Sequence, residues 1–432
     1  CKPDFYIKAV YQVNAEGDNI FLCNNKKYIA HMFIEGKKLF PGDEKFNCEY
    51  KFENPGNQTV YFQFTKANTG INNNQFFSGK EKLLSVVFSD FNEYFPDLGL
   101  LSLFQGCNHI ISVDLSNLYN HDLDSVQNMF QNCYKLVYVN FNIKYTLVVY
   151  YINEMFKNCH SLTSIDLSKF NVSSSTNFNY MFLNCYSLKY INIQSFKLDS
   201  ATTLQSMFHN CTSLISIDLS SFKPSQLTTM NSLFKNCYSL TSINLNKMYT
   251  SRVTDMYHLF YNCTSLKFLD ISSFNTENVQ YMEQMFYNCK SLTSINFGNN
   301  FNTNKVQEIN NIFTNCNSLQ SIDVPISVNY DVYFGHLKSF FENCYSLTSV
   351  NLQNFYTSNV EYFNNMFLNC YKLTSIDLSK FFFKDNAKIV NMVRGCYSLT
   401  SLDFPNLAPI MVNCKEIFYD CPNLKFVNFS II

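Results

Sequence analysis

Thirteen of the 17 cysteines form a ladder that constrains the fold of this 432-residue chain more than any other feature. Successive cysteines of the ladder are 26 residues apart, except for late steps of 27, 28 and 25 residues. Such regular spacing indicates one structural unit stacked many times, in place of the two or three domains that the length alone suggests. The ladder consists of Cys107, Cys133, Cys159, Cys185, Cys211, Cys237, Cys263, Cys289, Cys316, Cys344, Cys370, Cys396 and Cys421.

Each unit is predicted to contain a short strand and a helix. Apolar residues stand three, six and eight residues after the cysteine, a spacing typical of the inward-facing strand of a leucine-rich repeat. Before Cys289, apolar residues recur at helical spacing behind Thr276, a candidate N-cap, which predicts a convex helix. These apolar residues are Val279, Met282, Met285 and Phe286.

The residue immediately before the ladder cysteine is Asn in ten units, Gly in two and Asp in one. All three residue types tolerate a positive φ, so we expect the helix to stop here and the chain to turn into the next strand. The cysteine itself has two interpretations, a metal or redox array and a small buried core residue. Metal sites need paired thiolates at C-x-x-C spacing, which the sequence lacks, so structural free thiols are favoured.

The template fits once more upstream, in "FFSGKEKLLSVVFSDF", where Lys80 replaces the cysteine. Residues 1–75 differ, because β-forming runs alternate there with turn signals such as "PGDE" and "NPGN". The sequence therefore predicts an α/β solenoid of about fourteen strand-helix units over residues 76–432. A small β-sandwich cap over residues 1–75 is expected to precede it.

Charge and hydropathy narrow the range of partners. The chain has 32 basic and 33 acidic residues, a net charge of −1, and no basic run, which disfavours nucleic acid. No apolar run reaches the ~18 residues of a membrane span, and no signal peptide precedes Cys1. After Cys421 comes one more strand, "LKFVNFS", without an evident polar cap. We expect another molecule to cover this end if no further chain does.

Two positions of the repeat lie on the predicted concave side, and each forms a column of equivalent residues along the stack. Seven residues after the cysteine, Asp and Asn alternate almost without fault. This alternation separates like charges and lets amides donate to acids, so a self-compatible ladder explains it; binding of cations or a basic partner is the alternative. Two residues earlier the column is Ser in nine units, with Tyr138, Tyr190, Phe268 and Phe426 as exceptions. The candidate concave-face binding residues are Asp323, Asn351, Asp377 and Asp403.

A partial row of tyrosines directly follows the ladder cysteines. It is expected to pack at the rim of the sheet, and a binding role requires these rings to be exposed together. The row consists of Tyr134, Tyr186, Tyr238, Tyr345, Tyr371 and Tyr397.

Cysteines off the ladder suggest disulfides. Cys23 and Cys48 make a candidate pair, which would imply an oxidising compartment, and Cys414 is a candidate partner for Cys421. Sequons at Asn57 and Asn171 lie in predicted exposed turns and are candidate N-glycosylation sites. The sequence contains no Gly-rich phosphate loop and no G-x-S-x-G motif, so it predicts no enzyme, no catalytic residues, no bound metal and no cofactor.

The motif M-F-x-N-C-x-S-L-x-S-I-D-L-S-x-F, at Met155 to Phe170 and echoed through Cys421, resembles the BspA-like leucine-rich repeats of bacterial and protist surface proteins. It is most similar to their 26-residue form, first noted in mycoplasma, and the likeness covers residues 76–432. The segment from His31 to Phe64 also resembles the β module that precedes such arrays. The resemblance implies an extracellular or cell-surface location and roles in adhesion or matrix binding, with no catalytic residues.

Two classes of function follow. The favoured one is a non-enzymatic extracellular structural or adhesive surface protein that associates with itself, head to tail, into a fibre or surface layer. The alternative is a monomeric recognition module whose concave Ser/Asp/Asn face binds a glycan or a host or matrix protein. An intracellular scaffold ranks third.

Overall fold

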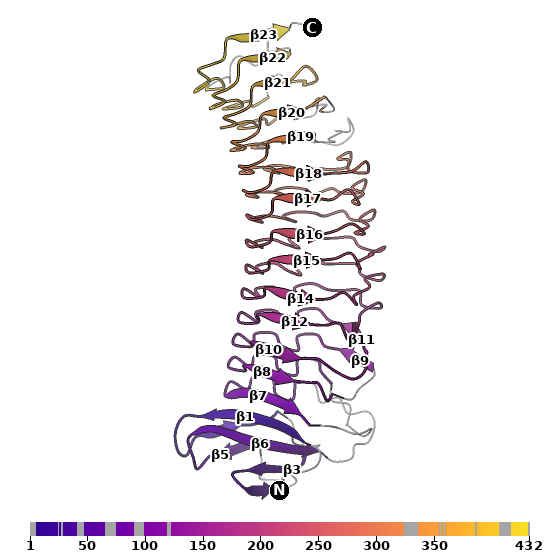
Figure 1. Cartoon of the computed structure of the whole chain (residues 1–432), viewed down its shortest axis with the longest axis vertical. Helices are drawn as coiled ribbons and strands as arrows, with labels where there is room; N and C mark the ends of the chain where they lie inside the picture. The colour runs from indigo at the N-terminus through magenta and orange to yellow at the C-terminus, as the bar shows by residue number, and fades with distance from the viewer. Residues whose placement is uncertain are drawn as a thin grey trace. The chain divides into compact units, whose positions relative to one another are not determined.

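The computed structural model describes residues 6–24, 26, 29–40, 47–64, 75–89, 99–118, 122–323, 336–353, 355, 357–358, 360–384, 387–405 and 416–430. The chain divides into two compact units, Cys1–Ala201 and Thr202–Ile432. The described residues of both units form strands and turns but no helix (Figure 1).

The described residues of the first unit form fourteen strands, the longest of which belong to its main sheet. They are β1 (Ile7–Val13), β2 (Asn19–Phe21), β3 (Ile29–Ile34), β4 (Lys37–Leu39), β5 (Glu49–Lys51), β6 (Gly56–Phe64), β7 (Leu83–Phe88), β8 (Ser112–Asp114), β9 (Asp122–Ser125), β10 (Tyr138–Asn140), β11 (Leu147–Tyr151), β12 (Ser164–Asp166), β13 (Phe170–Asn171) and β14 (Tyr190–Asn192). The main sheet has the strand order β10-β8-β7-β1-β6-β3-β4. β1 runs antiparallel to β6 and β7, whereas β7, β8 and β10 are parallel.

The structure does not support the expected β-sandwich cap, because β1, β3, β4 and β6 extend the sheet of the first coils. β1 buries every second side chain and pairs from Ile7 to Tyr11 with β7, the first strand of the repeat template. An open sheet edge is a template for aggregation, and antiparallel pairing with β1 removes that edge. The placement of a domain boundary after residue 75 stays a prediction.

In the described part of the second unit there are nine strands, most of them three residues long. They are β15 (Ser216–Asp218), β16 (Ser242–Asn244), β17 (Phe268–Asp270), β18 (Ser294–Asn296), β19 (Ser321–Asp323), β20 (Ser349–Asn351), β21 (Ser375–Asp377), β22 (Ser401–Pro405) and β23 (Phe426–Ser430). All of them pair in parallel, as β15-β16, β17-β18, β19-β20 and β21-β22-β23. Figure 1 shows β15 to β20 grouped two by two.

Donors in the second coil stabilise the pairs β17-β18 and β19-β20. In the pair β19-β20, the amide of Asn351 donates to Asp323 at 3.0 Å, and the hydroxyl of Thr348 donates to the Gln320 carbonyl at 3.0 Å. The pair β17-β18 repeats both bonds, at 3.2 and 2.8 Å. We call an Asp-bearing coil and the Asn-bearing coil bonded to it a coil pair. The alternation of Asp and Asn therefore marks a repeat of two coils.

Consecutive tight turns replace the predicted convex helices. Before Cys289, the amides of Met285, Tyr287 and Cys289 each donate three residues back, at 3.1–3.2 Å. The alternate amides of Met282, Gln284 and Phe286 donate at 2.9–3.0 Å to carbonyls of the next coil.

Positive φ angles close these turns and exclude a helix. Gln284 has φ 56° and Asn288 has φ 60°, and equivalent pairs recur along the chain. Turns of four residues bury residues three or four apart, which is also the spacing of a helical face. Thr276 is not an N-cap, since it is buried and its hydroxyl donates to the Asn302 carbonyl at 2.6 Å.

The asparagines before the ladder cysteines have the positive φ that the sequence predicts, and they also bond to one another. In the second unit the amide of Asn262 donates to Asn236 at 2.7 Å, and that of Asn288 donates to Asn262 at 2.7 Å. In the first unit Asn158 donates in the same way to Asn132 at 2.7 Å. Each amide row thus stabilises a backbone conformation that most residues avoid.

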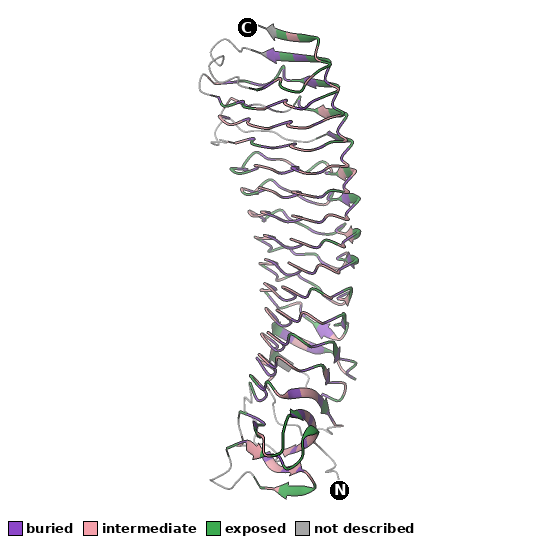
Figure 2. Ribbon diagram, turned by 90° about the vertical axis from the view of Figure 1, so that its left-hand side faces the viewer, coloured by how far each residue is buried: buried purple, intermediate pink, exposed green. Residues whose placement is uncertain are grey.

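The interior of each coil combines a cysteine with a phenylalanine. The thiol of Cys263 lies 3.3 Å from the Phe234 carbonyl oxygen of the preceding coil, to which it donates. Phe234, Phe260 and Phe286 are fully buried and stack at centroid distances of 5.8 Å and angles of 3–6°. Figure 2 shows buried residues recurring in successive coils of each unit.

Candidate functional site

The exposed side of the short strands is the candidate functional surface, and we call it the strand face. The first and third residues of the three-residue repeat strands, such as β15, β17 and β21, contribute to it, and the middle residue points into the coil. Asp and Asn at the third position also end the strand: Asp377 accepts the Ser379 amide at 2.9 Å, and Asn351 accepts the Gln353 amide at 3.1 Å. Hydrogen bonds from Ser379, with Lys380 nearby, lower the pKa of the Asp377 carboxyl.

The four residues predicted for concave-face binding are all exposed and fall into two groups. Asp323 and Asn351 stand opposite each other on β19 and β20, and Asp377 and Asp403 do so on β21 and β22. β20 and β21 belong to different sheets, so the structure does not join the two groups by strand pairing. A binding role for these residues stays a prediction.

A groove of about 500 Å³ opens on the strand face of the first unit, between β10 and β12. It lies where β10 ends one sheet and β12 begins another. Its polar lining comprises Tyr138, Asn140, Asn142, Ser164, Asp166, Ser168 and Lys169. One tyrosine ring, two amides, two serine hydroxyls, a carboxylate and an ammonium group offer both donors and acceptors to a polar ligand.

Sequence reasoning missed this groove, although one signal pointed to it. Tyr138 replaces Ser in the first strand position, and the side chains of the four aromatic exceptions are 53%, 61%, 54% and 71% exposed. An exposed aromatic ring at a strand position that is usually serine marks a departure from the repeat. Lys169 lies in the turn after β12, at a position where the repeats share no residue type.

The tyrosine row is exposed, but the rings cover one another. Tyr345, Tyr371 and Tyr397 stack at centroid distances of 4.8 and 5.0 Å, and the outer two are 36% and 45% exposed. In the first unit His160 takes the middle place of an equivalent stack, 4.9 Å from Tyr134 and 4.8 Å from Tyr186. Stacked rings offer their edges and hydroxyls to a partner, while their faces are occupied.

The ladder cysteines lie in the interior and not at a reactive surface. All except Cys421 are fully buried. Burial raises the pKa of Cys107 and of Cys289 to about 12, so both stay protonated at neutral pH. Because the thiolate is the nucleophile and the metal ligand, these thiols are suited to packing and to donating a hydrogen bond. Across the described ranges, no three His, Cys, Asp or Glu side chains are placed to hold a metal ion.

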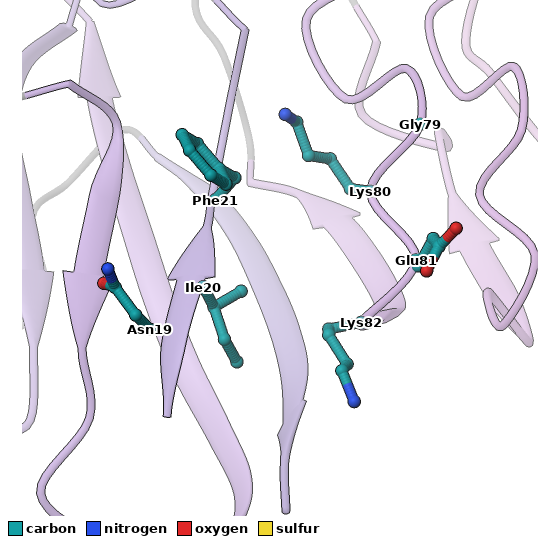
Figure 3. Close-up of a pocket in the computed structure, with 7 residues that line it drawn as sticks. All are labelled: Asn19, Ile20, Phe21, Gly79, Lys80, Glu81 and Lys82. Carbon is teal, nitrogen blue, oxygen red and sulfur yellow. The ribbon is translucent and has the colours of Figure 1, made fainter. Parts of the chain in front are cut away.

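Lys80 takes the place of a cysteine in the first coil. Its ammonium nitrogen lies 5.7 Å from the ring centroid of Phe21, and burial lowers its pKa. Both residues line a groove of about 290 Å³, in which they extend toward the same space (Figure 3). A cation–π contact thus replaces the thiol–carbonyl bond at this position.

The other predicted sites are the candidate disulfides and the candidate glycosylation sites. The structure joins Cys23 and Cys48 by a disulfide. Cys414 lies outside the described residues, and the Cys421 thiol is 3.1 Å from the Val393 carbonyl oxygen. Asn57 in β6 and Asn171 in β13 are exposed, and their glycosylation stays a prediction.

A polar cluster on the turn side of the second unit was not predicted. His258 is 8% exposed, accepts a hydrogen bond from Lys235 at 2.8 Å and donates to Gln284 at 2.7 Å. Burial, followed by the charge of Lys235, lowers the pKa of His258 to about 4, against the hydrogen bond with Gln284. Burial likewise lowers the pKa of the neighbouring His209 to about 4.

This cluster predicts that acid weakens the second unit. Between pH 6.5 and about 4 the unfolded chain binds a proton at His258 that the folded chain does not, so stability is complete above pH 6.5 and falls as pH decreases. We expect a loss of about 2 kcal/mol at pH 5 from His258, which His258→Gln removes. Urea unfolding at pH 7 and pH 5 measures this loss in the free energy of unfolding. An equal pH dependence for wild type and His258→Gln would contradict the assignment.

A helix long and apolar enough to cross a bilayer does not occur in the parts of the chain that the structure describes.

Several solved structures are similar to this chain over most of its length. A leucine-rich repeat protein from Bacteroides ovatus is 19% identical, with a TM-score of 0.43, over 81% of this chain and 92% of its own. A leucine-rich cell surface protein from Faecalibacterium prausnitzii is 17% identical, with a TM-score of 0.34, over 75% and 84%. A leucine-rich repeat protein from Eubacterium ventriosum is 13% identical, with a TM-score of 0.26, over 81% and 91%.

No curated protein matches the chain. One family model matches it four times in overlapping registers, at residues 99–217, 124–243, 202–324 and 299–406. These matches cover well over half of the chain and coincide with the region of the cysteine ladder. The chain therefore belongs to the family described as "Mycoplasma protein of unknown function, DUF285".

Proposed function

We propose that this chain is a non-enzymatic, extracellular recognition protein of BspA-like type, whose strand face binds a glycan or a protein. The groove between β10 and β12 carries the proposal, because it combines an exposed aromatic ring with hydrogen-bonding groups of both polarities. Ligand sites of proteins commonly join such apolar surface to a few placed polar groups. The stacked coils provide a rigid support for these side chains.

Two features support a location outside the cytosol. A disulfide between Cys23 and Cys48 is typical of proteins that fold in oxidising compartments. The exposed sequons at Asn57 and Asn171 are accessible to glycosylation.

Replacing Tyr138 by alanine tests the proposal. We expect binding of the purified chain to arrays of glycans and matrix proteins to weaken about tenfold or more, because exposed aromatic residues often dominate binding energy. Tyr151→Ala is the matched control, since Tyr151 is 59% exposed in the same unit and lies on β11, away from the groove. Unchanged binding by Tyr138→Ala, or equal loss in both variants, would reject the groove as the binding site.

Self-association is a second candidate, favoured by the surface of β23. Among the described residues β23 has a partner on one side only, and Phe426 is 71% exposed. A free strand edge with an exposed ring could pair head to tail with the N-terminal strands of another copy, or with a further coil of the same chain. We expect Phe426→Lys to abolish any filaments seen by electron microscopy. Electron micrographs of the wild-type chain at micromolar concentration that show isolated monomers and no filaments would exclude self-association.

A further inference from the structure

A second groove, of about 290 Å³, lies between β2 and the turn that leads into β7. β2 contributes Asn19, Ile20 and Phe21 to its lining, and the turn contributes Gly79 to Lys82. We call it the Lys80 groove. It belongs to the first unit and shares no residue with the groove between β10 and β12, so it is a separate candidate site.

The ammonium group of Lys80 is buried without a counter-charge. Lys80 is 9% exposed, and its ammonium nitrogen lies 5.7 Å from the ring centroid of Phe21. Among the described residues, no ion pair includes Lys80. Lysine is rarely buried unless it is paired, because removing a charge from water is costly. The groove therefore contains a positive charge that an anion can neutralise.

Packing alone does not explain a lysine at this position. In the next coil the equivalent residue, Cys107, donates its thiol hydrogen to the Phe77 carbonyl of the preceding coil at 2.9 Å. β7 pairs with the antiparallel β1 in place of a preceding coil, so position 80 lacks the coil that supplies this acceptor. An apolar side chain would fill the place beside Phe21 without the cost of desolvating a charge. The fold itself thus does not require a charge here.

The groups around Lys80 select the kind of anion. One positive charge and three donors match a carboxylate. Glu81 extends away from Phe21 (Figure 3), so it leaves the ammonium group accessible, while its own charge disfavours a dianion such as phosphate. Phe21 is 56% exposed, so part of its ring is free to pack against an apolar group beside the carboxylate.

A third groove, of about 240 Å³, adjoins the Lys80 groove, since Glu81 and Lys82 line both. Gln12, Asn14 and His109 complete its lining. The Nδ1 atom of His109 is buried and has no hydrogen-bond partner in the described part of the chain. Side-chain amides and a ring nitrogen can bond to the peptide groups of a longer ligand. A peptide whose last residue occupies the Lys80 groove therefore finds further partners here.

We propose that the Lys80 groove binds a carboxylate that is joined to an aromatic or other apolar group. The carboxylate accepts hydrogen bonds from the Lys80 ammonium group, and the apolar group packs on the ring of Phe21. A free organic acid and the C-terminus of a peptide both present this chemistry. The proposal goes beyond the proposed function, because it assigns a second site with a different ligand to the N-terminal part of the chain.

Saturation-transfer NMR with the full chain tests the ligand class. The probes are N-acetylphenylalanine, its neutral amide and inorganic phosphate. We expect the acid to bind about tenfold or more tightly than the amide, because only the acid forms charge-assisted hydrogen bonds with Lys80. Equal affinities of the acid and the amide, or tighter binding of phosphate than of the acid, would overturn the proposal.

A short peptide distinguishes the two sources of the carboxylate. If Ala-Ala-Phe binds more tightly than N-acetylphenylalanine, the adjoining groove contributes and the ligand is a peptide C-terminus. If the two bind equally, the ligand is a free organic acid.

Lys80→Met tests the place of binding and separates it from a structural role. We expect the affinity for N-acetylphenylalanine to fall about tenfold or more, and the urea midpoint to be equal to that of the wild type or higher, because an unpaired buried charge is replaced by an apolar side chain. Lys135→Met, which removes an exposed lysine of the same unit, is the matched control and should bind as the wild type does. A lower urea midpoint with unchanged binding would show that Lys80 serves the fold and not a ligand.

Phe21→Ala keeps the test decisive if Lys80→Met fails to fold. It removes a ring that is 56% exposed, and it is expected to weaken binding of the acid about tenfold. Unchanged binding by Phe21→Ala would overturn the assignment to this groove. Tyr138→Ala is expected to leave acid binding unchanged, since Tyr138 lines the other groove, and a loss in that variant would likewise overturn the assignment.

Discussion

Replacing Phe260 by alanine is expected to lower the free energy of unfolding of the second unit by about 3–5 kcal/mol. The ring of Phe260 is fully buried between Phe234 and Phe286, at centroid distances of 5.8 Å on both sides. Its removal leaves a cavity between successive coils, and each coil of a solenoid is stabilised mainly by its neighbours. Urea unfolding followed by circular dichroism measures the loss.

Two further variants separate the loss of the buried aromatic ring from the effect of substituting any aromatic residue in this unit. Phe260→Leu keeps most of the buried volume and should cost less than half as much. Tyr249→Ala removes an exposed ring of the same unit and should change the stability by less than about 0.5 kcal/mol. A Phe260→Ala variant within 1 kcal/mol of wild type would show that ring stacking does not hold the coils together.

Asn262→Ala is expected to destabilise the second unit by about 3 kcal/mol. Alanine at φ 61° costs about 1–2 kcal/mol, because its Cβ crowds the carbonyl in the left-handed region. The substitution also removes two amide bonds of 2.7 Å, one to Asn236 and one from Asn288, and leaves part-buried polar groups without partners.

Asn262→Gly distinguishes the two contributions. Glycine accepts the positive φ but makes no side-chain bond, so about half of the loss should remain. Thermal unfolding of the three proteins under identical conditions ranks them. If Asn262→Gly and the wild type unfold at the same temperature, the amide row contributes nothing to stability, and the backbone conformation alone explains why Asn recurs before the cysteine.

The period and the strand position could be predicted because both depend on local sequence. Apolar residues at fixed distances after each cysteine predict an apolar residue in the middle of each short strand, and in β15 and β17 this residue is buried. The positive φ before the cysteine was also predictable, because Asn, Gly and Asp share that tolerance. The second positive φ, at residues as different as His258 and Gln284, has no such compositional signal. A helix was therefore predicted where turns occur.

The N-terminal strands and the groove show a different limit. β-forming runs indicated that residues 1–75 contain strands, but not that β1 pairs with β7. Strand partners are chosen by tertiary contacts, which short-range patterns do not encode. The groove beside Tyr138 arises from a break between sheets, and such a break becomes visible only when the coils are stacked.

The coil pair also constrains how such a gene can change in length. Deleting a single coil between β15 and β20 would bring two acids or two amides side by side on the strand face, an arrangement that the described strand pairs show only at Asp377 and Asp403. Removing or duplicating two consecutive coils preserves every bond within the pairs. Among relatives of this chain, tolerated differences in repeat number should therefore be even.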